Sequence, residues 1–215
     1  MRIFVAGATG AIGQPLLAEL VRQGHIVTAM THSETGRQKR RTLGVTVVQV
    51  NAFDAPAVTE AIQRSKPELI IDQLTSLPTH PSAFATAFPA DGKLRLEGGG
   101  NLHRAAEAGG VRRYLQPSSG FFLKTGRGLA EEPEQLALDA NPGVAASACM
   151  DAALEARVLH ALQMEGVALR YGLFYGPHTR DDPQGGAADE VRRPQEPVVD
   201  QGQGVMISVL STAVT

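Results

Sequence analysis

Three glycines spaced three residues apart follow the first apolar run of the chain. The segment reads VAGATGAIGQPL, and Gly7, Gly10 and Gly13 stand between a strand-like run (2–7) and a helical repeat of leucines. Such a turn lets the backbone approach a phosphate, and the N-terminus of the helix offers unpaired N–H groups to it. This context predicts a dinucleotide-binding loop at the start of a parallel sheet, and the alternative is a tight turn without a ligand.

Apolar runs and amphipathic segments alternate beyond this loop. Strands are expected at 2–7, 25–32, 45–53, 67–76, 111–120 and 166–177, with helices at 13–24, 54–65, 96–109 and around 145–158. Strands that alternate with helices predict parallel strands joined by right-handed crossovers, which is a doubly wound, mostly parallel α/β sheet of the Rossmann type. Residues 76–92 and 120–143 are expected to be irregular.

Two parts of one structural unit are expected. Residues 1–177 form the dinucleotide-binding Rossmann domain, and the polar, Gly/Pro-rich residues 178–215 form a partial substrate lobe. The formal net charge of −2 argues against a nucleic-acid partner. The chain has one cysteine, no apolar run of membrane-spanning length and no signal peptide at its start, so we expect a cytoplasmic protein with a small-molecule substrate and no metal site.

Further segments resemble a known superfamily. Four features are similar to the short-chain dehydrogenase/reductase superfamily: the spacing of the glycines, the paired serines in LQPSSG (115–120), the Tyr-Gly-Pro of LRYGLFYGP (169–177) and the segment 192–204. The resemblance is to its atypical extended branch, the NAD(P)-dependent epimerase/dehydratase-like enzymes. It implies hydride transfer to or from a nicotinamide cofactor. Chains of this family usually continue further, so we expect a reduced C-terminal lobe.

The cofactor prediction combines the loop with this resemblance. No carboxylate precedes Glu34 at the end of the second strand, whereas Arg37 and further basic residues follow it. A 2′-phosphate needs cationic donors, so NADP(H) is favoured over NAD(H), although the basic run also fits a solvated surface. The predicted cofactor-binding residues are Gly7, Thr9, Gly10, Ala11, Ile12, Gly13, His32, Arg37, Asn51, Ala52, Gln73, Leu74 and Thr75.

The helix around AASACMDAALEARV lacks the tyrosine and lysine that the family uses. Glu155 resembles the glutamate that follows the lysine by four positions, which puts Asp151 at the lysine position and Ser147 at the tyrosine position. In the family the tyrosine exchanges a proton with the substrate, and the lysine lowers the pKa of the tyrosine and holds the ribose. A serine hydroxyl does not easily supply that proton, and an aspartate would raise a neighbour's pKa.

A minimal catalytic site is still conceivable. Ser118 and Ser119 are candidate hydrogen-bond donors to a substrate carbonyl, with Tyr175 or Lys124 as proton source; the alternative for the serines is a role in satisfying loop backbone. Arg170 is either a substrate contact or a structural ion-pair partner, and His178 is a weaker candidate.

Three functional hypotheses follow. The first is an NAD(P)-dependent oxidoreductase or epimerase/dehydratase-like enzyme acting on a small carbonyl, alcohol or sugar-nucleotide-like substrate. The second is a non-catalytic NADP(H)-binding sensor or regulatory protein, and the third is a relic that binds cofactor poorly. A homodimer formed through helix 147–163 is compatible with its apolar positions Leu154, Val158 and Leu162, although a core-facing helix has the same pattern.

Overall fold

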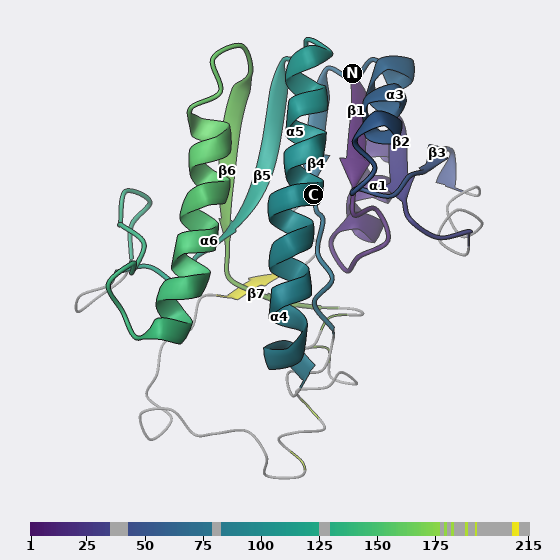
Figure 1. Cartoon of the computed structure of the whole chain (residues 1–215). Helices are drawn as coiled ribbons and strands as arrows, with labels where there is room; N and C mark the ends of the chain where they lie inside the picture. The colour runs from purple at the N-terminus through teal and green to yellow at the C-terminus, as the bar shows by residue number, and fades with distance from the viewer. Residues whose placement is uncertain are drawn as a thin grey trace.

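A six-stranded parallel sheet forms the centre of the molecule (Figure 1). The computed structural model describes residues 1–34, 43–78, 83–124 and 130–176, together with 179, 182, 188, 192 and 208–210. The strands are β1 (Arg2–Ala6), β2 (Ile26–Thr31), β3 (Thr46–Gln49), β4 (Leu69–Asp72), β5 (Arg113–Ser119) and β6 (Glu165–Tyr171). Their order is β3-β2-β1-β4-β5-β6. Strands β1 to β3 are added toward one edge of the sheet and β4 to β6 toward the other, so the strand order reverses between β1 and β4, which is where ligands bind in sheets of this kind.

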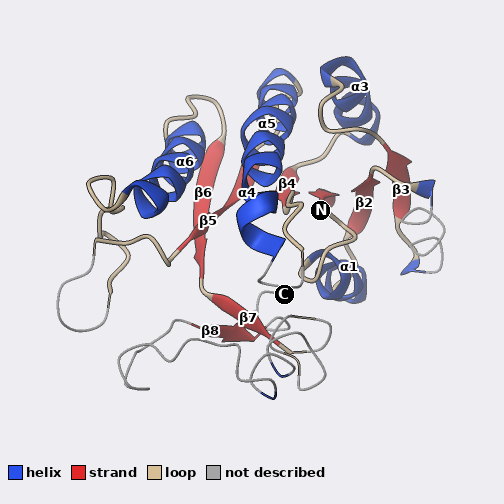
Figure 2. Cartoon of the chain, turned by 60° about the horizontal axis from the view of Figure 1, so that its bottom comes forward, coloured by secondary structure: helices blue, strands red, loops and turns tan. Residues whose placement is uncertain are grey.

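Helices cover both faces of the sheet. Figure 2 shows α1 (Gly13–Arg22) on one face and α3 (Ala55–Ser65), α5 (Gly99–Ala108) and α6 (Pro142–Leu159) on the other. A short π-helix, η3 (Leu94–Gly98), joins α4 (Phe84–Lys93) to α5 without interruption. The doubly wound α/β fold expected from the sequence is confirmed.

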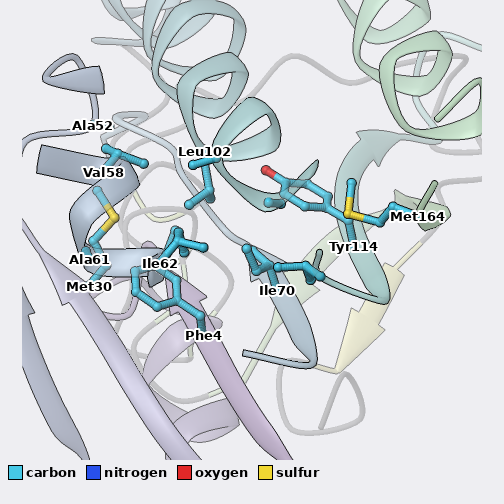
Figure 3. Close-up of a cluster of buried hydrophobic side chains, with 14 of the residues drawn as sticks. Phe4, Met30, Ala52, Val58, Ala61, Ile62, Ile70, Leu102, Tyr114 and Met164 are labelled. Atoms are coloured by element: carbon cyan, nitrogen blue, oxygen red, sulfur yellow. The ribbon is translucent and has the colours of Figure 1, made fainter. Parts of the chain in front are cut away.

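The continuous apolar strands are explained by burial on both sides. Phe4 of β1 packs with Ile62 of α3, Ile70 of β4 and Leu102 of α5 in one cluster (Figure 3). Alternate residues of the same strands pack against α1 in a second cluster. Since both faces of a parallel sheet are covered, its strands read as unbroken hydrophobic runs.

Local capping signals fix the starts of two helices. Asp54 accepts a hydrogen bond from the backbone N–H of Ala57 and caps α3. Asn141 caps α6 in the same way through the N–H of Val144, and Pro142 occupies the first turn of that helix. Of the three apolar positions considered for a dimer contact, Leu154 and Val158 are fully buried in the core of this chain, whereas Leu162, beyond the end of α6, is 97% exposed.

Two local expectations were wrong. Residues 84–92, expected to be irregular because of nearby prolines, form α4, with Pro89 inside the helix. The expected single strand 166–177 is divided at Gly172 into β6 and β7 (Leu173–Tyr175), and β7 pairs with β8 (Ser208–Leu210) in a separate two-stranded sheet. In both places contacts between distant segments contribute: Asp91 of α4 binds the loop after β4, and β7 pairs with a strand far away in the sequence.

Most of residues 178–215, expected to be a partial substrate lobe, lies outside the described residues. None of the helices in the described part of the chain is long and apolar enough to cross a membrane.

Candidate cofactor site and active site

A pocket of about 480 Å³ lies at the carboxyl ends of the strands around the point where the strand order reverses. It brings together residues from the ends of β1, β2, β3 and β4. The predicted cofactor residues that line it are Gly7, Thr9, Gly10, His32, Asn51, Ala52, Gln73, Leu74 and Thr75. The pocket lining also contains residues that the sequence analysis missed, namely Met30, Thr31, Val50, Phe53, Ser76 and Leu94.

The three glycines of the loop are required for different reasons. Gly7 has φ +69°, and a Cβ there would lie 1.9 Å from the carbonyl oxygen of Gln73. At Gly13 a Cβ would lie 2.5 Å from the carbonyl oxygen of Gly7. At Gly10 the nearest atom to a Cβ would be the Gly7 oxygen at 3.4 Å. The protein itself thus excludes a side chain at Gly7 and Gly13 but leaves space for one at Gly10.

The space beside Gly10 fits a ligand that approaches the backbone. Helix α1 begins after Ile12 with no side-chain cap and no acidic residue in its first turn. Its N-terminus therefore keeps the positive end of the helix dipole available to an anion. Ile12 is buried and Ala11 exposed in the turn before the helix. A cofactor pyrophosphate fits this arrangement, because it needs close backbone approach and unpaired N–H donors.

The opposite end of the pocket suits an adenosine group. Thr31 and His32 end β2, and no acidic side chain is found among the described residues that line the pocket. Asn51 accepts a hydrogen bond from the N–H of Phe53, whose half-exposed ring carries the Lys93 ammonium 5.5 Å from its centroid. Arg37, the predicted partner of a 2′-phosphate, lies outside the described residues.

Two buried carboxylates hold the loop after β4. Asp72 accepts a hydrogen bond from the N–H of Leu74 at 2.9 Å, and Asp91 accepts two, from the Thr75 hydroxyl at 2.8 Å and the Ser76 N–H at 2.6 Å. Burial raises the pKa of Asp72. Asp91 was not selected from the sequence, because it comes from the helix that was expected to be a loop.

The two serines at the end of β5 point to opposite faces of the sheet. Ser118 is buried and donates a 2.6 Å hydrogen bond to Oε1 of Glu155, which Arg170 binds through two further hydrogen bonds. Burial acts to raise the pKa of Glu155, but the hydrogen bonds from Arg170 and Ser118 hold it below its usual value. Ser119 accepts a hydrogen bond from the N–H of Phe121. Arg170 is therefore an ion-pair partner.

The other catalytic candidates lie apart from the pocket lining. Lys124 forms a 2.6 Å ion pair with Asp139 and lines a separate pocket of about 310 Å³. Tyr175 is 43% exposed on β7. His178 lies outside the described residues. The structure thus brings the cofactor candidates together, whereas Ser118, Ser119, Lys124 and Tyr175 do not line the glycine-loop pocket.

A second tyrosine hydroxyl lies at the same edge of the sheet. Tyr171 ends β6 beside Ser119, and its hydroxyl accepts a 3.0 Å hydrogen bond from Nε2 of the pocket residue Gln73. Burial raises the pKa of Tyr171, so the hydroxyl keeps its proton.

The two positions expected to match the family's tyrosine and lysine form no proton relay of the usual kind. Ser147 is partly buried on α6, and its hydroxyl donates a 3.4 Å hydrogen bond to the carbonyl oxygen of Gly143. Asp151 is fully buried, and its Oδ1 accepts a 3.2 Å hydrogen bond from Nη2 of Arg95 on η3. Burial raises the pKa of Asp151 to about 6. No motif in the sequence marks Arg95 as a site residue.

Comparison with known proteins agrees with this geometry. The profile of the NAD dependent epimerase/dehydratase family matches residues 3–195. A 3-diazoavenalumate denitrifying reductase from Streptomyces sp is 37% identical over 207 residues, which are 95% of this chain and 66% of the relative. The chain therefore spans slightly less than two thirds of the length of that protein.

Solved structures show the same fold. A UDP-glucose 4-epimerase from Thermus thermophilus, in complex with NAD, superposes with a TM-score of 0.71 and 24% identity, over 100% of this chain and 72% of the epimerase. The Bordetella bronchiseptica enzyme WbmH, in complex with NAD+, gives a TM-score of 0.69 and 20% identity, over 99% of this chain and 68% of that enzyme.

Proposed function

The chain belongs to the NAD dependent epimerase/dehydratase family, and on this basis we propose that it binds a nicotinamide dinucleotide in the glycine-loop pocket and exchanges hydride with a small substrate. The observation that carries the proposal is the space beside Gly10, which is open to a ligand at the uncapped N-terminus of α1. When bound, the cofactor supplies the hydride chemistry. The protein holds its phosphates and adenosine, and the loop over residues 73–76 borders its nicotinamide half.

NADP(H) is the proposed cofactor. A carboxylate at the end of the second strand would bind the ribose hydroxyls of NAD, and the described lining of the pocket offers Thr31 and His32 instead. A 2′-phosphate is tolerated where no carboxylate repels it, and Arg37 adds a cation nearby in the sequence. The similar solved structures are complexes with NAD, and titration with both cofactors tests the proposed preference.

The proposed reaction is a reduction that needs no proton from α6. Neither Ser147 nor the buried Asp151 replaces a tyrosine as a proton donor to the substrate. The Streptomyces relative is by name a reductase that removes nitrogen from a diazo compound. Hydride added to the carbon of a diazonium group forms a C–H bond while the C–N bond breaks and dinitrogen leaves. If bound NADPH supplied this hydride it would leave as NADP+, the charges would balance, and no proton would have to be transferred. A diazo substrate of this type therefore suits a site without the tyrosine.

A carbonyl or sugar-nucleotide-like substrate is the second candidate. It is favoured by Ser119, whose hydroxyl hydrogen has no acceptor among the described residues, and by Tyr175, which is an exposed residue. In this proposal Ser119, together with Ser118, polarises the carbonyl, and Tyr175 or Lys124 returns the proton. Residues 178–215 would contribute the substrate side of the same unit.

Isotope transfer distinguishes these proposals. The purified protein is incubated with NADPH deuterated at the transferable position and with either 3-diazoavenalumate or a UDP-4-ketohexose, whose carbonyl can accept a hydride, and the products are analysed by mass spectrometry. We expect deuterium in the reduced product of the diazo compound, together with release of dinitrogen. Exchange only with the sugar nucleotide would favour the second candidate, and its loss in Tyr175→Phe or Ser119→Ala would identify the donor. Binding of NADPH without transfer to any substrate would favour a sensor.

A further inference from the structure

Helix α6 has an aspartate at the position that resembles the family's lysine, and an arginine from η3 lies beside that aspartate. Asp151 occupies the position that resembles the lysine of the family, and the guanidinium of Arg95 from η3 lies on its carboxylate. We propose that Arg95 takes over the role of that lysine and donates hydrogen bonds to the nicotinamide half of the bound dinucleotide, with Asp151 as its counterion. This inference rests on the proposed cofactor binding.

The geometry of the guanidinium leaves donors for a ligand. Nη2 of Arg95 donates both to Oδ1 of Asp151 at 3.2 Å and to the carbonyl oxygen of Pro117 at 3.1 Å. These contacts place it between α6 and the carboxyl end of β5, two residues before Ser119. Within the described residues, Nε and Nη1 have no acceptor. The side chain is 13% exposed, so it reaches solvent from a largely buried position.

The π-helix that carries Arg95 is firmly anchored. Arg157 of α6 donates to the carbonyl oxygens of Arg95 at 3.2 Å and Leu96 at 3.1 Å, and to Oε1 of Gln116 on β5 at 2.6 Å. A Cβ at Gly99 would lie 3.0 Å from Nη2 of Arg157, so the glycine leaves room for this anchor. π-helical turns are rare in proteins, and those that occur are often found at functional sites. Here the turn is held against both α6 and β5.

The residue before Arg95 connects this anchored turn to the pocket. Leu94, directly before Arg95, lines the glycine-loop pocket. Asp72 directly precedes the pocket residue Gln73, and it lies close enough to Arg95 for the guanidinium charge to oppose the rise of its pKa. Leu94 thus borders the pocket near Ala52, whereas the Arg95 side chain on the same turn extends to Pro117 of β5 and Asp151 of α6, toward the side where the nicotinamide half is expected.

Charge balance explains why the two residues occur together. A buried carboxylate at the lysine position would repel a phosphate-rich cofactor and would be costly to bury alone. Arg95 neutralises it, and Oδ2 of Asp151 has no hydrogen-bond partner among the described residues, so the pair is not closed on itself. Arginine carries five donors, and two of them hold the pair in place while the rest remain for a ligand.

The test compares variants in a background without the buried charge. Removing Arg95 alone would strand Asp151, so Asp151→Asn is the reference and Arg95→Met/Asp151→Asn is the test variant. Each is titrated calorimetrically with NADPH and with 2′,5′-ADP, which carries only the adenosine half. We expect the double variant to bind NADPH about tenfold more weakly than the reference, as for one charge-assisted hydrogen bond, and to bind 2′,5′-ADP equally well.

A third variant asks whether the charge can return to α6. Arg95→Met/Asp151→Lys places a lysine on the helix, and we expect it to recover most of the lost NADPH affinity. Equal NADPH affinity of the reference and the double variant would overturn the inference. So would an equal loss for NADPH and 2′,5′-ADP, because this would indicate a general distortion of the pocket. If the native chain binds no dinucleotide at all, the proposed function fails and this inference fails with it.

Discussion

The replacement Gly10→Ala tests whether residue 10 is a glycine because the fold requires it or because ligand binding requires it. A Cβ at residue 10 would lie 3.4 Å from the Gly7 oxygen, and the backbone there is outside the left-handed region. The protein accommodates this contact with a shift of a few tenths of an ångström. An alanine also reduces the entropy of the unfolded chain, which stabilises by about 0.4–1 kcal/mol where no strain arises. We therefore expect the free energy of unfolding to stay the same or to rise slightly.

The same methyl group would stand where a pyrophosphate approaches the backbone. Loss of one hydrogen bond to a charged group costs about 1.5–3 kcal/mol, so NADPH affinity should fall roughly 10- to 150-fold. Calorimetric titration measures the affinity, and urea denaturation of the ligand-free protein measures the stability.

Gly13→Ala is the matched control. Its Cβ would lie 2.5 Å from the Gly7 oxygen and 2.8 Å from Ala8, both backbone atoms, so this variant should be clearly destabilised without any ligand. The reasoning is refuted if Gly10→Ala destabilises the protein as much as Gly13→Ala does, or if it binds NADPH as tightly as the native chain.

Three further predictions concern the fold. Asp54→Ala removes the cap of α3 and should cost about 1 kcal/mol in urea denaturation, with Asp54→Asn close to native; an unchanged midpoint for the alanine variant would contradict the cap. Tyr114→Phe removes a 2.9 Å donor to buried Asp72 and should cost about 1–3 kcal/mol by the same assay, and no loss would mean that Asp72 finds another donor. The pKa of Asp151 is raised from 3.8 to about 6, so its protonation favours the folded state below pH 4, and this stabilisation should disappear as pH rises through 6. Relative to Asp151→Asn, native stability should therefore fall over this interval, and parallel stability curves would contradict the assignment.

Much of the fold and the cofactor pocket could be predicted because the signals are local. The strand 2–6 is apolar on both faces, the glycines follow directly after it, and Asp54 caps α3. Each of these features is encoded within a few neighbouring residues. The pocket residues after β2, β3 and β4 follow from the rule that ligands bind at the carboxyl ends of parallel strands.

The missed features depend on contacts between distant segments. Pro89 argues locally against a helix, yet α4 is held by its continuation into η3 and by Asp91, which binds the loop after β4 from 15 and 16 residues away. Arg95 meets Asp151 across 56 residues, and no periodicity links the two. The catalytic candidates Ser118 and Lys124 were chosen by their place in the sequence, and their hydrogen bonds to Glu155 and Asp139 become visible only in three dimensions.

The central claim is that the glycine-loop pocket binds a nicotinamide dinucleotide, with NADP(H) preferred. Its most direct test is a pair of calorimetric titrations of the native protein, one with NADPH and one with NADH. We predict saturable one-to-one binding of NADPH and weaker binding of NADH. Tighter binding of NADH would contradict the proposed preference for the 2′-phosphate, and binding of neither would contradict the assignment of the pocket itself.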